Sequence, residues 1–399
     1  SSLTLIGRCN DKQGIDIIAL LVFSSANESQ RRMTTFVLME YLKYQCLMRK
    51  IRFKIQLASK LLAFSLFFCS SMMAQDDIPE TEGFSGYVIT GPGVFNIKSN
   101  TLVTGPPLLG DVGNKQIESV FDSPESNTSM AWAFAGEINY TFSKSRTQIF
   151  FGNRLEDVLR LDVPFGLGVR QELKDKSIMA LSLLSTPAEL KFWSDPYVEN
   201  EDREKTILTF RGVRWRWGRM FNTGLELTAT FRWYQHDLEK SGSWLVEQGR
   251  IDSEDLGLLD RDGNVVRLQG LYRFDFGKKH RIEPAIQAVY DNHHGEAMAT
   301  QGFVAKVTYL YATPKIVLDF NAAYGQRNAR ALHPVYNEKG DSDRFGVAFT
   351  FFKPFKITEK SIWSFWGSVE YLNEDSKIDF FDSSVTAVMG GVMWKHRRK

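Results

Sequence analysis

The chain has 399 residues, of which 43% are hydrophobic, 24% charged and 13% aromatic, and its formal net charge is +2. The mean hydropathy of −0.24 and the lack of any run of about 20 apolar residues exclude a membrane protein built from helices. A membrane β-barrel is compatible with this composition, because only every second residue of each strand must be apolar.

The first feature along the chain is an export signal. Five basic residues and no acidic residue lie between Met48 and Lys60, and the short apolar run 61–74 follows and ends at Ala74. This order is typical of a secretory signal peptide, so we predict that residues 48–74 are removed after Ala74. A buried helix of a cytosolic protein is the alternative. Residues 1–47 are then an upstream extension outside the mature protein, or else a leader, and residues 75–399 form the mature barrel.

Export also explains the use of cysteine and charge. All three cysteines (Cys9, Cys46 and Cys69) lie before the predicted cleavage point, which excludes disulfides, thiolate metal sites and cysteine catalysis in the mature chain. Cleavage removes 10 of the 49 basic and 4 of the 47 acidic residues, which leaves 39 against 43. We therefore expect no nucleic-acid partner.

An alternation of apolar and polar residues recurs along the rest of the chain. In 224–236, apolar residues occupy the odd positions from Leu225 to Trp233, and mainly polar residues occupy the even ones. Side chains of a strand point to opposite faces in turn, so each such stretch predicts a ribbon with one apolar and one polar face. The predicted strands are 84–97, 131–142, 147–154, 158–173, 177–190, 205–217, 221–237, 264–276, 280–292, 296–311, 315–324, 343–355, 361–373 and 385–394.

The connections between these strands alternate in length. Tight turns such as 143–146, 174–176 and 218–220 occupy every second connection, and longer segments such as 98–130 and 238–263 lie between them. An up-and-down barrel with short periplasmic turns and long extracellular loops has this parity, whereas a Greek-key sandwich does not. We predict an all-β, transmembrane, up-and-down antiparallel β-barrel of about 14 strands, with 12 or 16 as alternatives and a soluble sandwich as the competing fold.

The polar faces of the strands are the candidate lining of the lumen. Charged rings select ions in pores, so basic residues on these faces favour anionic solutes. The alternative is a lumen made rigid by ion pairs, because acidic residues nearly match the basic ones. The candidate selectivity residues are Arg160, Arg170, Arg214, Arg216, Glu226, Arg232, Arg267, Arg273 and Glu283.

Catalytic and metal-binding patterns are weak. His293-His294-Gly295-Glu296 has no serine beside it, and Asp260-Arg261-Asp262-Gly263-Asn264 lacks the distant glutamate of a calcium loop. Both are typical of solvated turns. We therefore predict no enzyme, no cofactor, no metal and no catalytic residue.

Four short stretches carry a family resemblance: Gly83-Phe84-Ser85-Gly86-Tyr87, Phe150-Phe151-Gly152-Asn153-Arg154, Trp193-Ser194-Asp195-Pro196-Tyr197 and Leu259-Asp260-Arg261-Asp262-Gly263. Together they resemble an uncharacterised family of proteobacterial proteins of unknown function, presumed to be outer-membrane β-barrels. The last strand ends near Trp394, similar to the assembly signal of such barrels, but the basic segment 395–399 follows it.

These features lead to one functional expectation with two alternatives. We expect an outer-membrane channel or solute-uptake barrel whose partners are outer-membrane lipid, lipopolysaccharide, the barrel-assembly machinery and a small solute. A non-conducting structural or adhesive barrel is the first alternative, and an outer-membrane barrel enzyme is the second.

Overall fold

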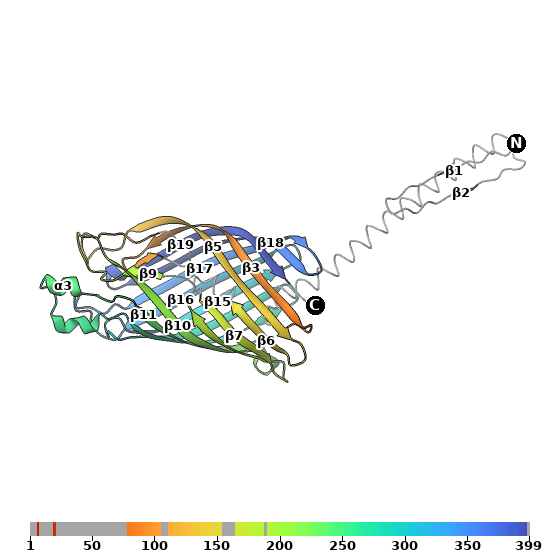
Figure 1. Ribbon diagram of the computed structural model, residues 1–399, viewed down its shortest axis with the longest axis horizontal. Coiled ribbons are helices and arrows are strands. Elements are labelled where there is room, and N and C mark those ends of the chain that lie inside the picture. The colour runs from red at the N-terminus through yellow and green to blue at the C-terminus, as the bar shows by residue number, and fades with distance from the viewer. Residues whose placement is uncertain are drawn as a thin grey trace, which may run out of the picture. The chain divides into compact units, whose positions relative to one another are not determined.

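Figure 1 shows the computed structural model, which describes residues 78–104, 111–153, 164–186 and 190–396. It also describes a two-residue strand pair, β1 (Ile6–Gly7) with β2 (Ala19–Leu20), in a separate unit formed by residues 1–68. The predicted signal peptide, and the predicted upstream extension apart from that pair, lie outside the described residues. Among the described residues, no helix is long and apolar enough to cross a membrane.

The second unit is a closed antiparallel barrel (Figure 1). It has fourteen strand positions, two of them split (β8 with β9, and β12 with β13), and the short β4 (Leu102–Thr104) pairs with β9 at its rim. The predicted fold class is therefore confirmed. The strands are β3 (Gly83–Lys98), β5 (Ser126–Phe142), β6 (Thr147–Gly152), β7 (Phe165–Glu172), β8 (Ile178–Ser185), β9 (Leu190–Trp193), β10 (Lys205–Gly218), β11 (Leu225–His236), β12 (Gly263–Tyr272), β13 (Phe274–Phe276), β14 (His280–His293), β15 (Thr300–Ala312), β16 (Val317–Ala329), β17 (Ser342–Ile357), β18 (Ser361–Ser376) and β19 (Ser383–His396).

Pairing of the last strand with the first closes the ring. Trp394 of β19 lies opposite Val88 of β3, and Ser384 lies opposite Lys98. Gly91 and Gly391 allow the two backbones to approach closely here, because a Cβ on either residue would fall within 2.1 Å of a carbonyl oxygen of the neighbouring strand. Pairing of β19 with β3 joins the first and last strands, so among the described residues the barrel has no edge strand.

The connections sort by length onto the two ends of the barrel, as the sequence predicts. Tight turns occupy one end. The longer connections start at the other end and are named here in chain order: L1 (99–125, of which 105–110 are not described), L2 (153–164, of which 154–163 are not described), L3 (194–204), L4 (237–262), L5 (294–299), L6 (330–341) and L7 (377–382). L4 contains the helix α3 (Ser243–Glu247) and the 3-10 turn η2 (Ser253–Leu258), and L7 contains η3 (Asp379–Phe381).

The outer surface of the barrel is apolar. Trp132, Phe134 and Ile138 of β5 are each about half exposed, and Leu181, Leu183 and further residues on neighbouring strands continue this surface. On β11, the alternating partners of the exposed apolar residues are buried in the barrel. Apolar residues outside and polar ones inside are the arrangement of a barrel in lipid.

The inner surface departs from the expectation that polar faces line all of the lumen. Along β3, β5, β17, β18 and β19, inward residues form an apolar cluster that includes Tyr87, Ile89, Phe95, Trp366 and Met389. The outward residues beside this cluster are also mainly apolar, so alternation alone does not reveal which face points inward there. This cluster forms an apolar wall of the lumen, and polar residues, including Glu137 of β5 and Glu370 of β18, line the rest.

Candidate functional site

The polar wall of the lumen contains two ion-paired clusters. In the first, Arg170 of β7 donates to both carboxylate oxygens of Glu137 on β5, at 2.9 and 2.5 Å, and also to the side chains of Asn139 and Gln148. The Arg170 guanidinium also lies 4.0 Å from the centre of the Phe150 ring. Both charged side chains are almost fully buried, so each depends on the other for its stability.

The second cluster is a chain of alternating charges from β10 through β11 and the junction of β12 with β13 to β14. Glu226 binds Arg216 Nε at 2.9 Å and Arg273 Nη2 at 2.9 Å, and Arg273 Nε donates to Glu283 at 3.0 Å. These four residues are among the predicted selectivity residues, and the structure brings them together. Each charge has an opposite partner, so this wall is a fixed ion-paired lining.

The first cluster provides a stability test. Arg170→Met should lower the free energy of unfolding by about 3–5 kcal/mol, because it leaves the Glu137 carboxylate buried without its cation. The double variant Arg170→Met, Glu137→Leu should recover most of that loss, since no charge is then left alone. Guanidinium unfolding of the barrel in micelles measures both variants. Equal losses in the single and double variants would contradict the ion-pair assignment.

A cavity of about 350 Å³ lies in the lumen between β12 and β19. Four cationic side chains line it, Arg267, Lys306, Arg327 and Arg344, against the two carboxylates of Glu370 and Glu374. Its volume is at the lower end of the ~300–1,000 Å³ typical of small-molecule sites. Unlike the ion-paired wall, this cavity has an excess of positive charge.

Small residues on β16 and β17 create the space. Ala323 lies opposite Gly346 in the ladder, and the next inward positions are Gly325 on β16 and Ala348 on β17. At Gly346 an added Cβ would lie 2.5 Å from Leu372, so even a methyl group would displace the facing side chain. These four positions therefore set the size of the cavity.

The cationic end of the cavity is near the long loops. Arg327 binds Asp291 at 3.1 Å, and Arg344 binds Glu374, whose other oxygen accepts from Ser342 at 2.7 Å. Arg267 and Arg344 are close enough to interact electrostatically with Arg327. Three arginines thus share two carboxylates, Asp291 and Glu374.

The structure separates the predicted selectivity residues. Arg267 lines the cavity, whereas Arg170, Arg214 and Arg216 line a much smaller space near β7, β8 and β10. Arg232 lies over the Phe210 ring at 5.1 Å. Arg160 lies outside the described residues. Their role in selectivity stays a prediction.

Sequence reasoning missed Lys306, Arg327, Arg344, Glu370 and Glu374. Arg327 lies beyond the predicted end of its strand, because Gly325, Gln326 and Asn328 are typical of a loop. Inside a barrel, polar residues continue a strand without cost when they face the lumen. Extending the alternation from Asp319 through Asn321 to Arg327 would have found it.

The long loops form a cap with its own apolar core. This core joins Val120 of L1, Tyr197 of L3, Leu245 of L4, Ala297 of L5 and Phe380 of L7, with Tyr336 of L6 packed against it. Loops that start at different points around the ring thus meet in one cluster. Such a cluster must lie across the mouth of the barrel.

One hydrogen bond spans the mouth directly. His333 Nε2 of L6 lies 2.9 Å from Tyr197 Oη of L3, and Tyr336 Oη donates to the carbonyl of Val120 in L1 at 2.8 Å. Six strands separate L3 from L6 along one side of the ring and eight along the other. The contact therefore joins nearly opposite points of the rim.

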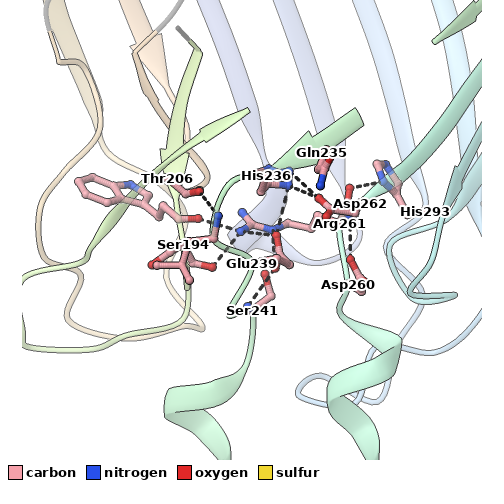
Figure 2. Close-up of polar contacts among 12 residues, drawn as sticks. Ser194, Thr206, Gln235, His236, Glu239, Ser241, Asp260, Arg261, Asp262 and His293 are labelled. Carbon is pink, nitrogen blue, oxygen red and sulfur yellow. Dashed lines mark hydrogen bonds and ion pairs between the residues drawn. The ribbon is translucent and has the colours of Figure 1, made fainter. Parts of the chain in front are cut away.

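A buried arginine holds the base of the cap on the side of L3 and L4. Figure 2 shows Arg261 between Glu239 and the backbone that follows β9. Its Nη2 donates to the carbonyls of Trp193 and Ser194 at 2.8 and 3.0 Å, and its Nε lies 3.0 and 3.2 Å from the two oxygens of Glu239. This arginine ties L4 to the rim.

The same junction contains a group of metal-type ligands. His236, Glu239 and Asp262 each place one ligand atom within 4.8 Å of the others, and His236 Nδ1 lies 2.8 Å from Asp262 (Figure 2). Because the Arg261 guanidinium already contacts both oxygens of Glu239, this carboxylate is neutralised by an arginine. We assign the group to the junction and propose no metal there.

His333 makes the cap sensitive to acid. Its Nδ1 accepts from the Val335 amide at 3.3 Å, which leaves the proton on Nε2, and burial lowers the pKa of His333 to about 3. In an opened cap this pKa is about 6.5. Between pH 6.5 and 3 the open form therefore binds a proton that the closed form does not, so the closed cap loses stability as the pH falls.

We expect this loss to disappear in His333→Gln. Burial raises the pKa of Asp195 in L3, which acts in the opposite direction and stabilises the closed cap as the pH falls. Spin labels on cysteines introduced at the exposed Glu201 and Lys339 would report the distance between L3 and L6 at pH 8 to 4. A wild-type cap that stays closed at pH 4 would refute the assignment to His333.

Comparison with known proteins identifies the family. The sequence pattern of the family described as protein of unknown function (DUF2860) matches residues 83–395. The chain belongs to this family. This confirms the resemblance seen in the four short stretches. No curated protein matches the chain.

Solved structures similar to this DUF2860 chain are distant in sequence. A Pseudomonas aeruginosa FadL homologue is 10% identical with a TM-score of 0.38, covering 79% of this chain and 90% of that one. An anion-selective porin from Comamonas acidovorans is 7% identical with a TM-score of 0.34, covering 79% and 100%. The outer-membrane channel DcaP of Acinetobacter baumannii is 8% identical with a TM-score of 0.34, covering 78% and 96%. Similarities this low assign no function.

Proposed function

We propose that this DUF2860 protein is a bacterial outer-membrane, porin-like barrel that takes up a small solute and prefers anions. Its outer surface is apolar along the strands, as lipid requires, and its lumen contains space. Lipid and lipopolysaccharide are its surroundings, and the barrel-assembly machinery inserts it. We propose no enzymatic activity.

The observation that carries the proposal is the lumen cavity with its excess of cations. Arg267, Lys306, Arg327 and Arg344 outnumber the two carboxylates that line the same space. A cationic constriction attracts anions and repels cations, because charges in a narrow lumen are weakly screened. The ion-paired clusters elsewhere on the polar wall add rigidity, because each of their charges has an opposite partner.

The cap supports a second candidate function. Its apolar core and the contact between Tyr197 and His333 cross the mouth, which is the arrangement expected of a non-conducting structural or adhesive barrel. In the first proposal the same cap is a closed gate that opens for the solute. The two functions differ in whether ions ever pass.

Planar bilayer recording separates them. We expect single-channel steps from the purified barrel, with a reversal potential in a tenfold KCl gradient that shows chloride passing more readily than potassium. Permanent silence at every voltage and at pH 8 to 4 would favour the structural barrel. Steps with a potassium preference would retain the channel and refute the anion preference.

A further inference from the structure

The two ends of the lumen cavity differ in chemistry along β17 and β18. Arg344 lies opposite Glu374 at the end near the loops, Gly346 lies opposite Leu372 next, and Ala348 lies opposite Glu370 furthest away. The sequence of environments is therefore cationic, then apolar, then anionic. An extended ligand in this space meets all three.

The cationic end presents an accessible guanidinium group. Arg344 lines the cavity, and its side chain is 31% exposed although its Nη2 binds Glu374. A cation with accessible surface in a narrow lumen attracts an acceptor oxygen of a ligand. The planar guanidinium group suits the planar carboxylate group in particular.

The middle of the cavity is mainly apolar. Leu372, Val385 and Ala323 line it, and Lys306 lies opposite Ala323 in the ladder. Val385 also packs against the apolar cluster that includes Met389 of the same strand, so the apolar lining continues out of the cavity. An inorganic anion would leave this surface without a partner, whereas an aliphatic chain would cover it.

The far end rejects a second acidic group. Glu370 is 2% exposed and accepts a hydrogen bond of 2.9 Å from Ser368, which in turn contacts Thr350. Both are hydroxyl groups, and among the described residues no cation contacts this carboxyl group. A ligand with carboxylates at both ends would place one of them against Glu370.

We infer that the cavity binds a small organic monocarboxylate, with the carboxylate at Arg344 and an apolar body against Leu372 and Val385. This inference rests on the proposed solute-uptake function and names its substrate class. It distinguishes the ligand from inorganic anions, from neutral alcohols and from dicarboxylates.

Isothermal titration calorimetry on the whole barrel in micelles tests it with matched probes: hexanoate, 1-hexanol, adipate and inorganic phosphate. We expect hexanoate to bind at least about tenfold more tightly than each of the others, because it alone matches both the charge and the apolar body. If phosphate bound as tightly as hexanoate, the site would recognise anions without regard to an apolar body. If 1-hexanol bound as tightly as hexanoate, Arg344 would not contribute to binding.

Three variants locate the site. Arg344→Gln should weaken hexanoate at least about tenfold and leave 1-hexanol unchanged. Glu370→Gln should improve adipate and leave hexanoate nearly unchanged. Ala323→Leu keeps every charge but fills the cavity, so it should abolish hexanoate binding. Hexanoate binding that survives both Arg344→Gln and Ala323→Leu would place the ligand elsewhere and overturn the inference.

Different results would refute the inferred substrate class and the proposed uptake function. Anion-selective conductance without hexanoate binding would refute the substrate class and keep the uptake barrel. Hexanoate binding in a barrel that never conducts, and that does not pass hexanoate into liposomes, would keep the site and refute uptake. A heat-modifiable gel shift confirms that each variant is folded before it is measured.

Discussion

Phe380→Ala should open the cap and raise the mean conductance of the barrel several-fold. Phe380 is 1% exposed and stacks on Tyr197 at 5.4 Å between ring centres, so it joins L7 to L3 in the middle of the mouth. Removing a buried phenylalanine costs about 3–5 kcal/mol. That loss would shift the balance between closed and open caps by more than about 100-fold.

The matched control is Leu332→Ala. Leu332 lies in L6 beside His333, but it is 51% exposed, so its removal leaves the apolar core of the cap intact. Single-channel recording in planar bilayers compares the two variants with the wild type. The open fraction should rise only in Phe380→Ala. Unchanged recordings from both variants would show that the cap does not limit conductance.

The barrel itself could be predicted from the sequence, because its periodicity is local. The face that a residue takes in a strand depends on its position in that strand, and the turn lengths alternate along the chain. Both patterns can be recognised in the sequence without knowledge of tertiary contacts. The observed strands accordingly fall at all fourteen predicted positions.

The cavity could not be predicted in this way. It depends on residues from seven strand positions that face one another across the lumen, and on small residues that leave space. Arg170 and Arg267 look alike in sequence, since both alternate with apolar neighbours. Only the three-dimensional structure, which places Glu137 beside Arg170, shows that Arg170 belongs to a buried ion pair and that Arg267 lines the cavity.

The cap could not be predicted from the sequence either. L1 is rich in Gly, Pro, Ser and Asn, and L3 and L4 are rich in charged residues. Both compositions are typical of solvated loops, and the core residues of the cap are scattered among them. Tyr197 and His333 are 136 positions apart, and no local pattern relates them. Long-range packing of this kind becomes visible only after the barrel brings the loop ends to a common rim.

Loss of two cations from the cavity should reduce anion selectivity, and loss of an arginine from the wall should not. Arg267→Gln together with Lys306→Gln leaves Arg327 and Arg344 with their own carboxylate partners. A unit charge about 4 Å from a permeating ion contributes about 1 kcal/mol in water-like surroundings. Each substitution should therefore lower the chloride-to-potassium permeability ratio roughly fivefold.

Arg232→Gln is the comparison that decides between the two kinds of arginine. Arg232 is 2% exposed and lies over the Phe210 ring, away from the residues that line the cavity. It should keep the wild-type reversal potential and lose unfolding free energy instead. Position in the cavity, rather than the number of arginines on polar faces, then sets selectivity. If both variants shifted the reversal potential equally, selectivity would depend on the charges of the whole polar wall and not on the cavity alone.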